Sequence, residues 1–220
     1  MNGGADLRHV DTWLFDLDNT LYPRESGLGA LMEPRITDFV MEVTGLEREA
    51  AFALQKQYLR DHGLTLKGLM ADHGVDPHGY HARVHDVPLD AIGPDSALRA
   101  GLERLPGRRL VFTNADETHA RRILDRLAIA DLFDEVFHIG SAAFEPKPSP
   151  AAFAALLRAH AVLPARTCFF EDSLINLRAG KGIGMTTVLV GAAEAPPAFV
   201  DYHAPVLARF LAEAKVSEGR

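Results

Sequence analysis

The chain of 220 residues lacks several features that define large classes of protein. It has one cysteine, Cys168, so it cannot form an internal disulfide, and the run "TCFFEDS" around it suggests a small buried hydrophobe. No apolar run approaches the roughly 20 residues of a membrane-spanning helix. The opening "MNGGADLRHVD" lacks the apolar centre of a signal peptide. We therefore expect a cytoplasmic protein with no membrane partner.

The chain also lacks positive charge. Its 23 lysines and arginines are outnumbered by 30 aspartates and glutamates, giving a formal net charge of -7. This balance argues against binding to polymeric nucleic acid or to anionic membranes. An anionic substrate would therefore need positive charge supplied locally by the site. With 47% apolar and 24% charged residues, the composition is that of an ordinary soluble globular protein. The sequence gives no indication of the oligomeric state.

Short apolar runs of strand length recur along the chain. They lie at residues 12–16, 109–114, 135–139, 167–172 and 186–191. Helical patterns separate the last four, and one of them opens with Ser149 as N-cap and Pro150 at the first helical position. This alternation predicts an α/β fold with a doubly wound, mainly parallel, Rossmann-like sheet. The tail "DYHAPVLARFLAEA" predicts an edge strand and a closing helix.

The interval 22–94 contains no strand-like run. It is instead typical of amphipathic helices, which we expect at 29–44, 47–62, 65–73 and 77–84, with glycines between them. A helical segment of this length after the first strand predicts an inserted cap. The α/β core would then comprise residues 1–21 and 95–220.

Polar side chains stand where the predicted strands end. They are Asp16 and Asp18, Thr113 and Asn114, Lys147, and finally Glu171 and Asp172. Each group alone is weak evidence, because acids after a strand usually cap a helix or face solvent. In open α/β sheets, however, ligands bind beyond the carboxyl ends of the strands, so these groups are expected to converge.

The predicted set suits phosphoryl transfer. Several carboxylates in one crevice repel one another unless a cation joins them, and hard oxygen ligands suit Mg²⁺. Asp16 can then attack phosphorus as a nucleophile, and Asp18 can act as general acid and base. Thr113 can bond the phosphoryl oxygens, and Lys147 can neutralise developing charge.

Four short motifs carry a family resemblance. In order along the chain, "FDLDNT", "FTN", "KP" and "FEDS" resemble the motifs of the haloacid dehalogenase-like (HAD) hydrolase superfamily, and the insert is similar to its C1 cap. The resemblance implies that Asp16 is the nucleophile and Asp18 the acid/base, while Thr113 and Lys147 bind phosphate. It further implies that Asp16, the carbonyl of Asp18 and Asp172 hold Mg²⁺.

Longer stretches resemble the pyrimidine 5′-nucleotidase-like subgroup. They are "FDLDNTLYP", "GLTLKGL", "YHARVHD" and "FFEDSLINLRAGKGIGMTTVLVG". The resemblance implies a nucleoside 5′-monophosphate as substrate, and Thr20 and Asn114 are expected to contact it. It also implies a cis bond before Pro148. Two residues depart from the common pattern, because Glu171 and Asn176 stand where relatives often carry aspartate or another acid. We therefore expect Glu171 to reach the metal indirectly, through water.

Other interpretations compete with this one. A phosphosugar mutase or sugar-phosphate phosphatase keeps the same acid pair, and an inactive binding module keeps the same fold. A cap that closes over the sheet edge favours a small phosphorylated metabolite. Tyr58, Leu66, Met70 and His81 are the cap residues we consider for specificity, although core packing is the simpler explanation for the apolar ones.

Two further features have competing explanations. His81 and His85 stand four residues apart, so one helix face can present both to a metal, although hydrogen-bonded histidines are the commoner case. Arg24 lies just after the first motif, where it can meet a substrate or form a surface salt bridge.

Overall fold

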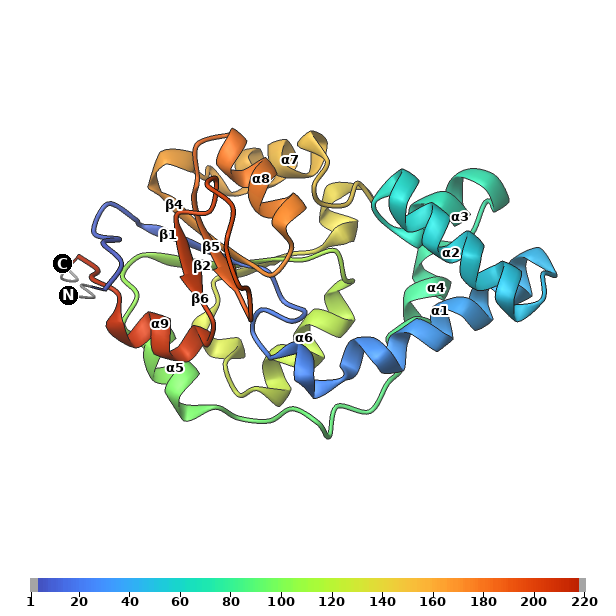
Figure 1. Ribbon diagram of the computed structural model, residues 1–220, viewed down its shortest axis with the longest axis horizontal. Helices are drawn as coiled ribbons and strands as arrows, with labels where there is room; N and C mark the ends of the chain where they lie inside the picture. Colours follow the sequence, from blue (N-terminus) through green and yellow to red (C-terminus); the bar gives the residue numbers. More distant parts are fainter. Residues whose placement is uncertain (1–3, 218–220) are drawn as a thin grey trace.

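The computed structural model describes residues 4–217, and its centre is a parallel six-stranded sheet. The strands are β1 (Thr12–Phe15), β2 (Arg108–Phe112), β3 (Glu135–Phe137), β4 (Thr167–Glu171), β5 (Thr186–Val190) and β6 (Tyr202–Ala204). Their order is β3-β2-β1-β4-β5-β6 (Figure 1). The predicted doubly wound α/β fold is therefore confirmed, including the edge strand in the C-terminal tail.

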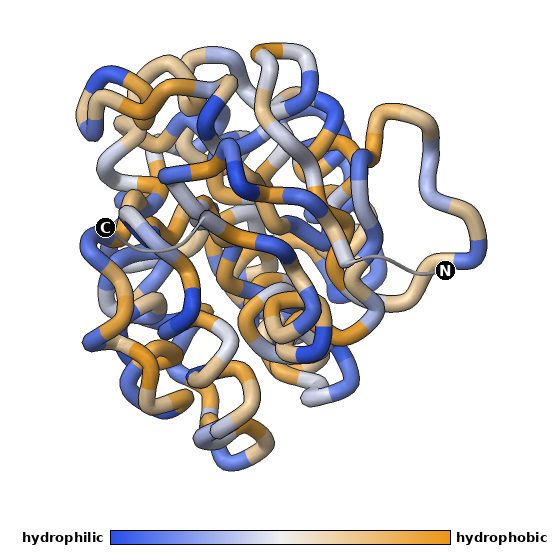
Figure 2. Tube along the Cα trace, turned by 90° about the vertical axis from the view of Figure 1, so that its left-hand side faces the viewer, coloured by the Kyte–Doolittle hydropathy of each residue, from blue (hydrophilic) through white to orange (hydrophobic). Residues whose placement is uncertain are grey.

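Strands β1 and β4 are buried along their whole length because helices cover both faces of the sheet. Side chains alternate between the faces, so that Trp13 and Phe15 of β1 enter one apolar cluster and Leu14 enters the other. Helices α5 (Ser96–Glu103), α6 (Glu117–Arg126) and α9 (Leu207–Glu213) cover one face, and α7 (Pro150–His160) and α8 (Leu174–Gly182) cover the other (Figure 1). Hydrophobic and hydrophilic residues are interspersed along the trace (Figure 2). Only α5 was absent from the elements predicted from the sequence.

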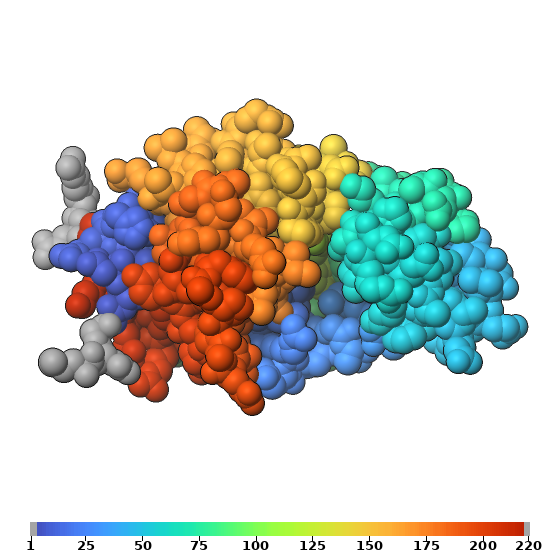
Figure 3. All heavy atoms as spheres, turned by 45° about the horizontal axis from the view of Figure 1, so that its top comes forward, coloured from blue at the N-terminus to red at the C-terminus, as the bar shows by residue number. Residues whose placement is uncertain are grey.

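A separate lobe of four helices forms the predicted cap. It consists of α1 (Leu28–Thr44), α2 (Arg48–His62), α3 (Thr65–His73) and α4 (Pro77–Val84), all within one residue of the predicted bounds. The first three end at glycines with positive φ, namely Gly45, Gly63 and Gly74. In Figure 3 the cap and the core form two lobes with a hollow between them.

The cap has its own apolar centre, which includes Phe39, Tyr58 and Leu66. The first and last parts of the insert pack elsewhere, because Leu28 and Ile92 are buried in one of the two core clusters. These two ends of the insert thus pack with the core, and the cap boundaries of 22 and 94 stay a prediction.

None of the helices within residues 4–217 has the length and apolar character needed to cross a membrane.

Candidate active site

The site lies where the sheet topology reverses. The chain runs outward from β1 to β2 and β3, then returns to place β4 on the other side of β1. A crevice at the carboxyl ends of the strands is expected at such a point. Asp16 follows β1, and its N–H donates to Phe170 O of β4 at 2.9 Å. Glu171 ends β4 and Asp172 follows, so that the two acidic motifs lie side by side as predicted.

Lys147 lies at the centre of this crevice with 2% of its surface exposed. Its Nζ donates to Asp16 Oδ1 at 2.6 Å, to Glu171 Oε2 at 2.8 Å and to the carbonyl of Phe112 at 2.7 Å. An ammonium group has three donors, so all of its hydrogen-bonding capacity is used. The lysine therefore joins the first and fourth motifs to the end of β2.

Asn114 positions this lysine through the backbone. Its Oδ1 accepts from Lys147 N at 2.8 Å, and its Nδ2 donates to Lys147 O at 3.2 Å. The bond between Lys147 and Pro148 is cis, as expected from the sequence. Thr113 precedes Asn114, is 2% exposed, and accepts from the N–H of Ala115 at 3.0 Å. Thr113 and Asn114 both line the crevice, where their predicted contacts with substrate stay predictions.

Burial and crowding change the acidity of the carboxyl groups. Burial raises the pKa of Asp16 to about 6; Lys147 opposes the rise and Asp18 adds to it. Burial also raises the pKa of Glu171 to about 8, with the charge of Asp16 adding and Lys147 opposing. Burial alone would lower the pKa of Lys147, but these two carboxylates outweigh it and raise that pKa. The lysine thus stays protonated while the acids repel one another.

Oxygen atoms of Asp16, Glu171 and Asp172 lie within 4.8 Å of one another. A buried set of carboxylate oxygens fits Mg²⁺, which prefers hard oxygen ligands and neutralises their mutual repulsion. Asp172 Oδ2 also accepts from the exposed guanidinium of Arg24 at 2.8 Å, so Arg24 forms an ion pair at the edge of the site. The salt bridge considered from the sequence is confirmed, and its partner is a predicted metal ligand.

Glu171 is more heavily engaged than the other acids. Its Oε2 accepts from Asn176 Nδ2 at 3.0 Å as well as from Lys147, and its Oε1 accepts from Ser173 N at 3.1 Å. The two residues that depart from the common motif therefore contact each other. These bonds engage both of its carboxyl oxygens, and the indirect contact with the metal that was expected for Glu171 stays a prediction.

Asp18 is held by two groups that the sequence did not point out. Its Oδ1 accepts from the hydroxyl of Tyr22 and from His119 Nε2 at 3.1 Å. His119 is fully buried on the inner face of α6. Burial favours the protonated acid, but the bond from His119, that residue's charge and the bond from Tyr22 outweigh it and lower the pKa of Asp18. The position of His119 on the apolar stripe of a helix is the one sequence signal that could have suggested this contact.

Thr20 lies behind Asp16. Its hydroxyl donates to Asp16 Oδ2 at 3.1 Å, and the residue is 3% exposed. Both oxygens of Asp16 are thus hydrogen-bonded, one by Lys147 and the other by Thr20. The expected role of Thr20 in binding substrate stays a prediction.

A cavity of 890 Å³ lies over the site and is covered by the cap. Its cap residues come from the end of α2, the turn at Gly63 and the start of α3, and they include Leu59, Arg60, His62, Leu64 and Lys67. The lobes are joined beside it by an ion pair of Lys67 Nζ and Glu145 Oε2 at 2.6 Å. The cap residues considered for specificity lie elsewhere. Tyr58 and Leu66 are buried in the centre of the cap, Met70 packs against it, and His81 lines another cavity.

Two curated proteins are similar to this chain in sequence. The chain is 31% identical over 193 residues to "Phosphate metabolism protein 8" of Saccharomyces cerevisiae, covering 80% of this chain and 60% of that protein. It is 27% identical over 115 residues to "Phosphorylated carbohydrates phosphatase" of Thermotoga maritima, covering 50% of this chain and 53% of that protein. The chain thus spans little more than half the length of either curated relative.

The fold has solved counterparts. A HAD phosphatase from Thermococcus onnurineus superposes with a TM-score of 0.61 at 20% identity, covering 90% of this chain and 94% of that one. The model of the haloacid dehalogenase-like hydrolase family matches residues 10–184, which include all four motifs. The chain therefore belongs to the haloacid dehalogenase-like hydrolases.

Proposed function

We propose that the protein hydrolyses the phosphate monoester of a small metabolite, most specifically a nucleoside 5′-monophosphate, through an aspartyl-phosphate at Asp16. The observation that carries this proposal is the buried contact of Asp16, Lys147 and Glu171 beneath a capped cavity. A fold gains nothing from clustering acids around one lysine, since such a cluster costs desolvation energy. A nucleophile and its electrostatic support need this arrangement.

In the first step, a carboxylate oxygen of Asp16 bonds to phosphorus and the bond between phosphorus and the ester oxygen breaks. Asp18 gives its proton to the departing oxygen, so that an alcohol leaves. The hydrogen bonds from Tyr22 and His119 both reach Oδ1 of Asp18, which fixes the carboxyl and directs Oδ2 to proton exchange. Lys147 stabilises the charge on the transferring group.

In the second step, water attacks the phosphorus of the aspartyl-phosphate. Asp18, now ionised, accepts the proton of that water, and inorganic phosphate leaves as the carboxylate of Asp16 is restored. The lowered pKa of Asp18 suits this second step, in which the ionised form is the base, and opposes the first step, which needs the protonated form. The raised pKa of Lys147 keeps its ammonium group charged throughout.

Asp16, Glu171 and Asp172 offer carboxylate oxygens that would hold Mg²⁺, and the family resemblance adds the backbone carbonyl of Asp18. When bound, the ion supplies positive charge that polarises the phosphoryl group and offsets the repulsion between substrate and carboxylates. The chain's own residues supply the nucleophile Asp16, the proton carrier Asp18 and the cation Lys147, which contacts Asp16.

The cap supports a small anionic substrate. Arg60, His62 and Lys67 bring positive or protonatable groups to the cavity in an otherwise acidic protein, and Leu59 and Leu64 add apolar surface. Apolar surface suits a nucleobase, and the cations suit phosphate and ribose oxygens. A sugar phosphate is the second candidate, favoured by the name of the Thermotoga maritima relative, "Phosphorylated carbohydrates phosphatase".

The test is release of inorganic phosphate from a panel containing uridine, cytidine and adenosine 5′-monophosphates, ribose 5-phosphate and glucose 6-phosphate, with and without Mg²⁺. We expect release that needs Mg²⁺ and disappears in Asp16→Asn. Circular dichroism of this variant controls for folding. Activity that survives both chelation and Asp16→Asn would contradict the mechanism. Formation of an isomerised sugar phosphate without free phosphate would show a mutase. If no compound of the panel reacted although the protein was folded and bound Mg²⁺, an inactive binding module would be favoured.

A further inference from the structure

A second group of metal-ligating side chains lies between the cap and the core. Helix α4 carries His81, and its C-cap residue His85 follows one turn later, while Asp116 caps the N-terminus of α6 in the core. One ligand atom from each of the three lies within 4.8 Å of the others. Asp116 Oδ2 is 2.5 Å from His85 Nδ1 and 3.6 Å from His81 Nδ1. The sequence showed the two histidines, but only the fold brings the carboxylate to them.

His81 is the observation that points to a ligand. It is 5% exposed, and neither ring nitrogen has a hydrogen-bond partner within residues 4–217. An unsatisfied buried polar group costs about 1–3 kcal/mol, so native structures usually give each one a partner. Burial first, and then the charge of His85, lower the pKa of His81 to about 4. Its ring is therefore neutral near pH 7 and can offer a lone pair.

We propose that His81, His85 and Asp116 bind a divalent transition-metal ion of the Zn²⁺ class. Two imidazoles and one carboxylate form a donor set that suits Zn²⁺ and its neighbours and does not suit Mg²⁺. Ligands about 2.0–2.1 Å from a tetrahedral ion lie about 3.3 Å from each other. The 3.6 Å between His81 and Asp116 is close to that spacing. On binding, the hydrogen bond between His85 and Asp116 is replaced by two coordinate bonds, and these atoms move apart.

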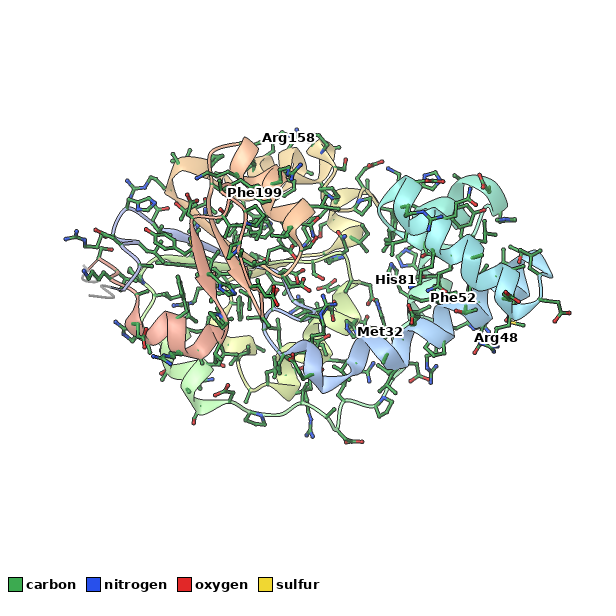
Figure 4. All side chains as sticks on the ribbon, viewed as in Figure 1. Met32, Arg48, Phe52, His81, Arg158 and Phe199 are labelled. Atoms are coloured by element: carbon green, nitrogen blue, oxygen red, sulfur yellow. The ribbon has the colours of Figure 1, made fainter. Side chains whose placement is uncertain are left out.

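The surroundings leave room for the ion and for water in its remaining position. A cavity of 630 Å³ is lined by all three ligands together with His78, Thr118 and Arg122. Figure 4 shows His81 on the side of the cap that faces the core. The site is separate from the predicted Mg²⁺ ligands, which line the cavity of 890 Å³ instead.

Such an ion would join the two lobes of the molecule. His81 and His85 belong to the cap and Asp116 to the core, and Arg122 of the core already donates to the carbonyl of His85 at 2.8 Å. The ring of His85 stacks on that of His119 at 4.2 Å, and His119 in turn holds Asp18. The bound ion therefore fixes the cap against the core beside the residue proposed as acid and base.

The test is zinc binding to the full chain after metal is stripped, measured by calorimetry in excess Mg²⁺, with Co²⁺ as a visible-light probe of nitrogen ligation. His81→Gln and Asp116→Asn remove one ligand each. Asparagine also caps helices, so Asp116→Asn keeps the start of α6. His78→Gln is the matched control, because His78 is exposed on the same helix and lines the same cavity. Asp172→Asn removes a ligand of the other site.

We expect one zinc ion per chain and a loss of affinity of at least about tenfold in His81→Gln and in Asp116→Asn. His78→Gln and Asp172→Asn should bind zinc as the unmodified chain does. Thermal melts of the metal-free variants check that each is folded. The proposal would be overturned if the chain bound no zinc in excess Mg²⁺. It would also be overturned if His81→Gln and Asp116→Asn bound zinc as tightly as the unmodified chain, or if only Asp172→Asn lost zinc affinity. None of these readouts depends on phosphatase activity.

Discussion

Replacing Lys147 by methionine tests the electrostatic basis of the site. The lysine is buried, and its ammonium group is the cation that contacts both Asp16 and Glu171. Methionine fills a similar volume and removes the charge and all three hydrogen bonds. Two carboxyl groups are then left in a low-dielectric crevice beside a backbone carbonyl, that of Phe112, which has also lost its donor.

The expected loss in free energy of unfolding is about 3–5 kcal/mol near pH 8 without metal, the usual cost of removing one partner of a buried ion pair. Lys181 offers a matched control, because it pairs with Asp201 at 2.6 Å in the same lobe but at a partly exposed position. Lys181→Met should cost no more than about 1 kcal/mol. Adding Glu171→Gln to Lys147→Met should recover part of the loss, since one buried charge is removed.

The loss should depend on pH with a definite sign. The folded-state pKa values of Asp16 and Glu171, about 6 and about 8, exceed their ordinary values of 3.8 and 4.5. The folded protein therefore binds more protons than the unfolded chain, and stability falls as pH rises from about 4 to 8. Removing Lys147 takes away the charge that holds these pKa values down. They rise further, and the fall with pH becomes steeper.

Urea unfolding in chelator at pH 5 and pH 8 measures both effects. We expect Lys147→Met to lower the midpoint much more at pH 8 than at pH 5, with an unchanged m-value. Mg²⁺ should restore part of the stability at pH 8 if the remaining carboxylates still bind it. The same shift at both pH values, or a loss no larger than that of Lys181→Met, would refute the electrostatic argument.

Three other substitutions test, one by one, the packing of the cap, the binding of substrate and the role of the proton carrier. A Cβ on Gly68 would lie 2.3 Å from the ring of Tyr58, so Gly68→Ala should destabilise the cap by about 1–3 kcal/mol. The loss would be measured as faster amide hydrogen exchange in the cap. Gly29→Ala is the control and should leave the exchange unchanged, because a Cβ there meets nothing within 4 Å. Arg60→Met should raise KM for a phosphate ester several-fold with little change in kcat, because we expect Arg60 to bind the substrate in the ground state. A loss in kcat as large as the loss in kcat/KM would contradict that role. Asp18→Asn should slow turnover at least about 100-fold, and undiminished steady-state phosphate release would contradict its role.

Most of the fold follows from local patterns. The continuous apolar run at 12–15 predicts a strand buried on both faces, and the glycine after each of the first three cap helices predicts where that helix ends. The convergence of the motifs follows from one topological rule, that ligands bind beyond the carboxyl ends of strands. The helix at 96–103 was missed although Asp95 caps its start and Leu98 and Leu102 stand four residues apart on its buried face.

The contacts between lobes did not follow from the sequence. Which face of a cap helix meets the core depends on packing between segments far apart in the chain, so that Arg60 and Lys67 reach the cavity while Tyr58 turns inward. The partner of Asp18 was missed for the same reason. His119 stands 101 residues away, and no local period predicts which buried histidine meets which acid.

The charge of the site argues for two cations rather than one. Asp16, Glu171 and Asp172 contribute three negative charges when ionised, and Lys147 returns one. The remaining charge of about -2 would repel a phosphate dianion at close range. A divalent ion brings the site to neutrality; without the ion, protonation of Glu171, whose pKa is about 8, reduces the charge to about -1 near pH 7. A buried glutamate with a raised pKa therefore assists anion binding where a fully ionised aspartate would oppose it. On this argument Glu171→Asp should weaken phosphate binding more at pH 7 than at pH 9, because the shorter acid loses its proton earlier.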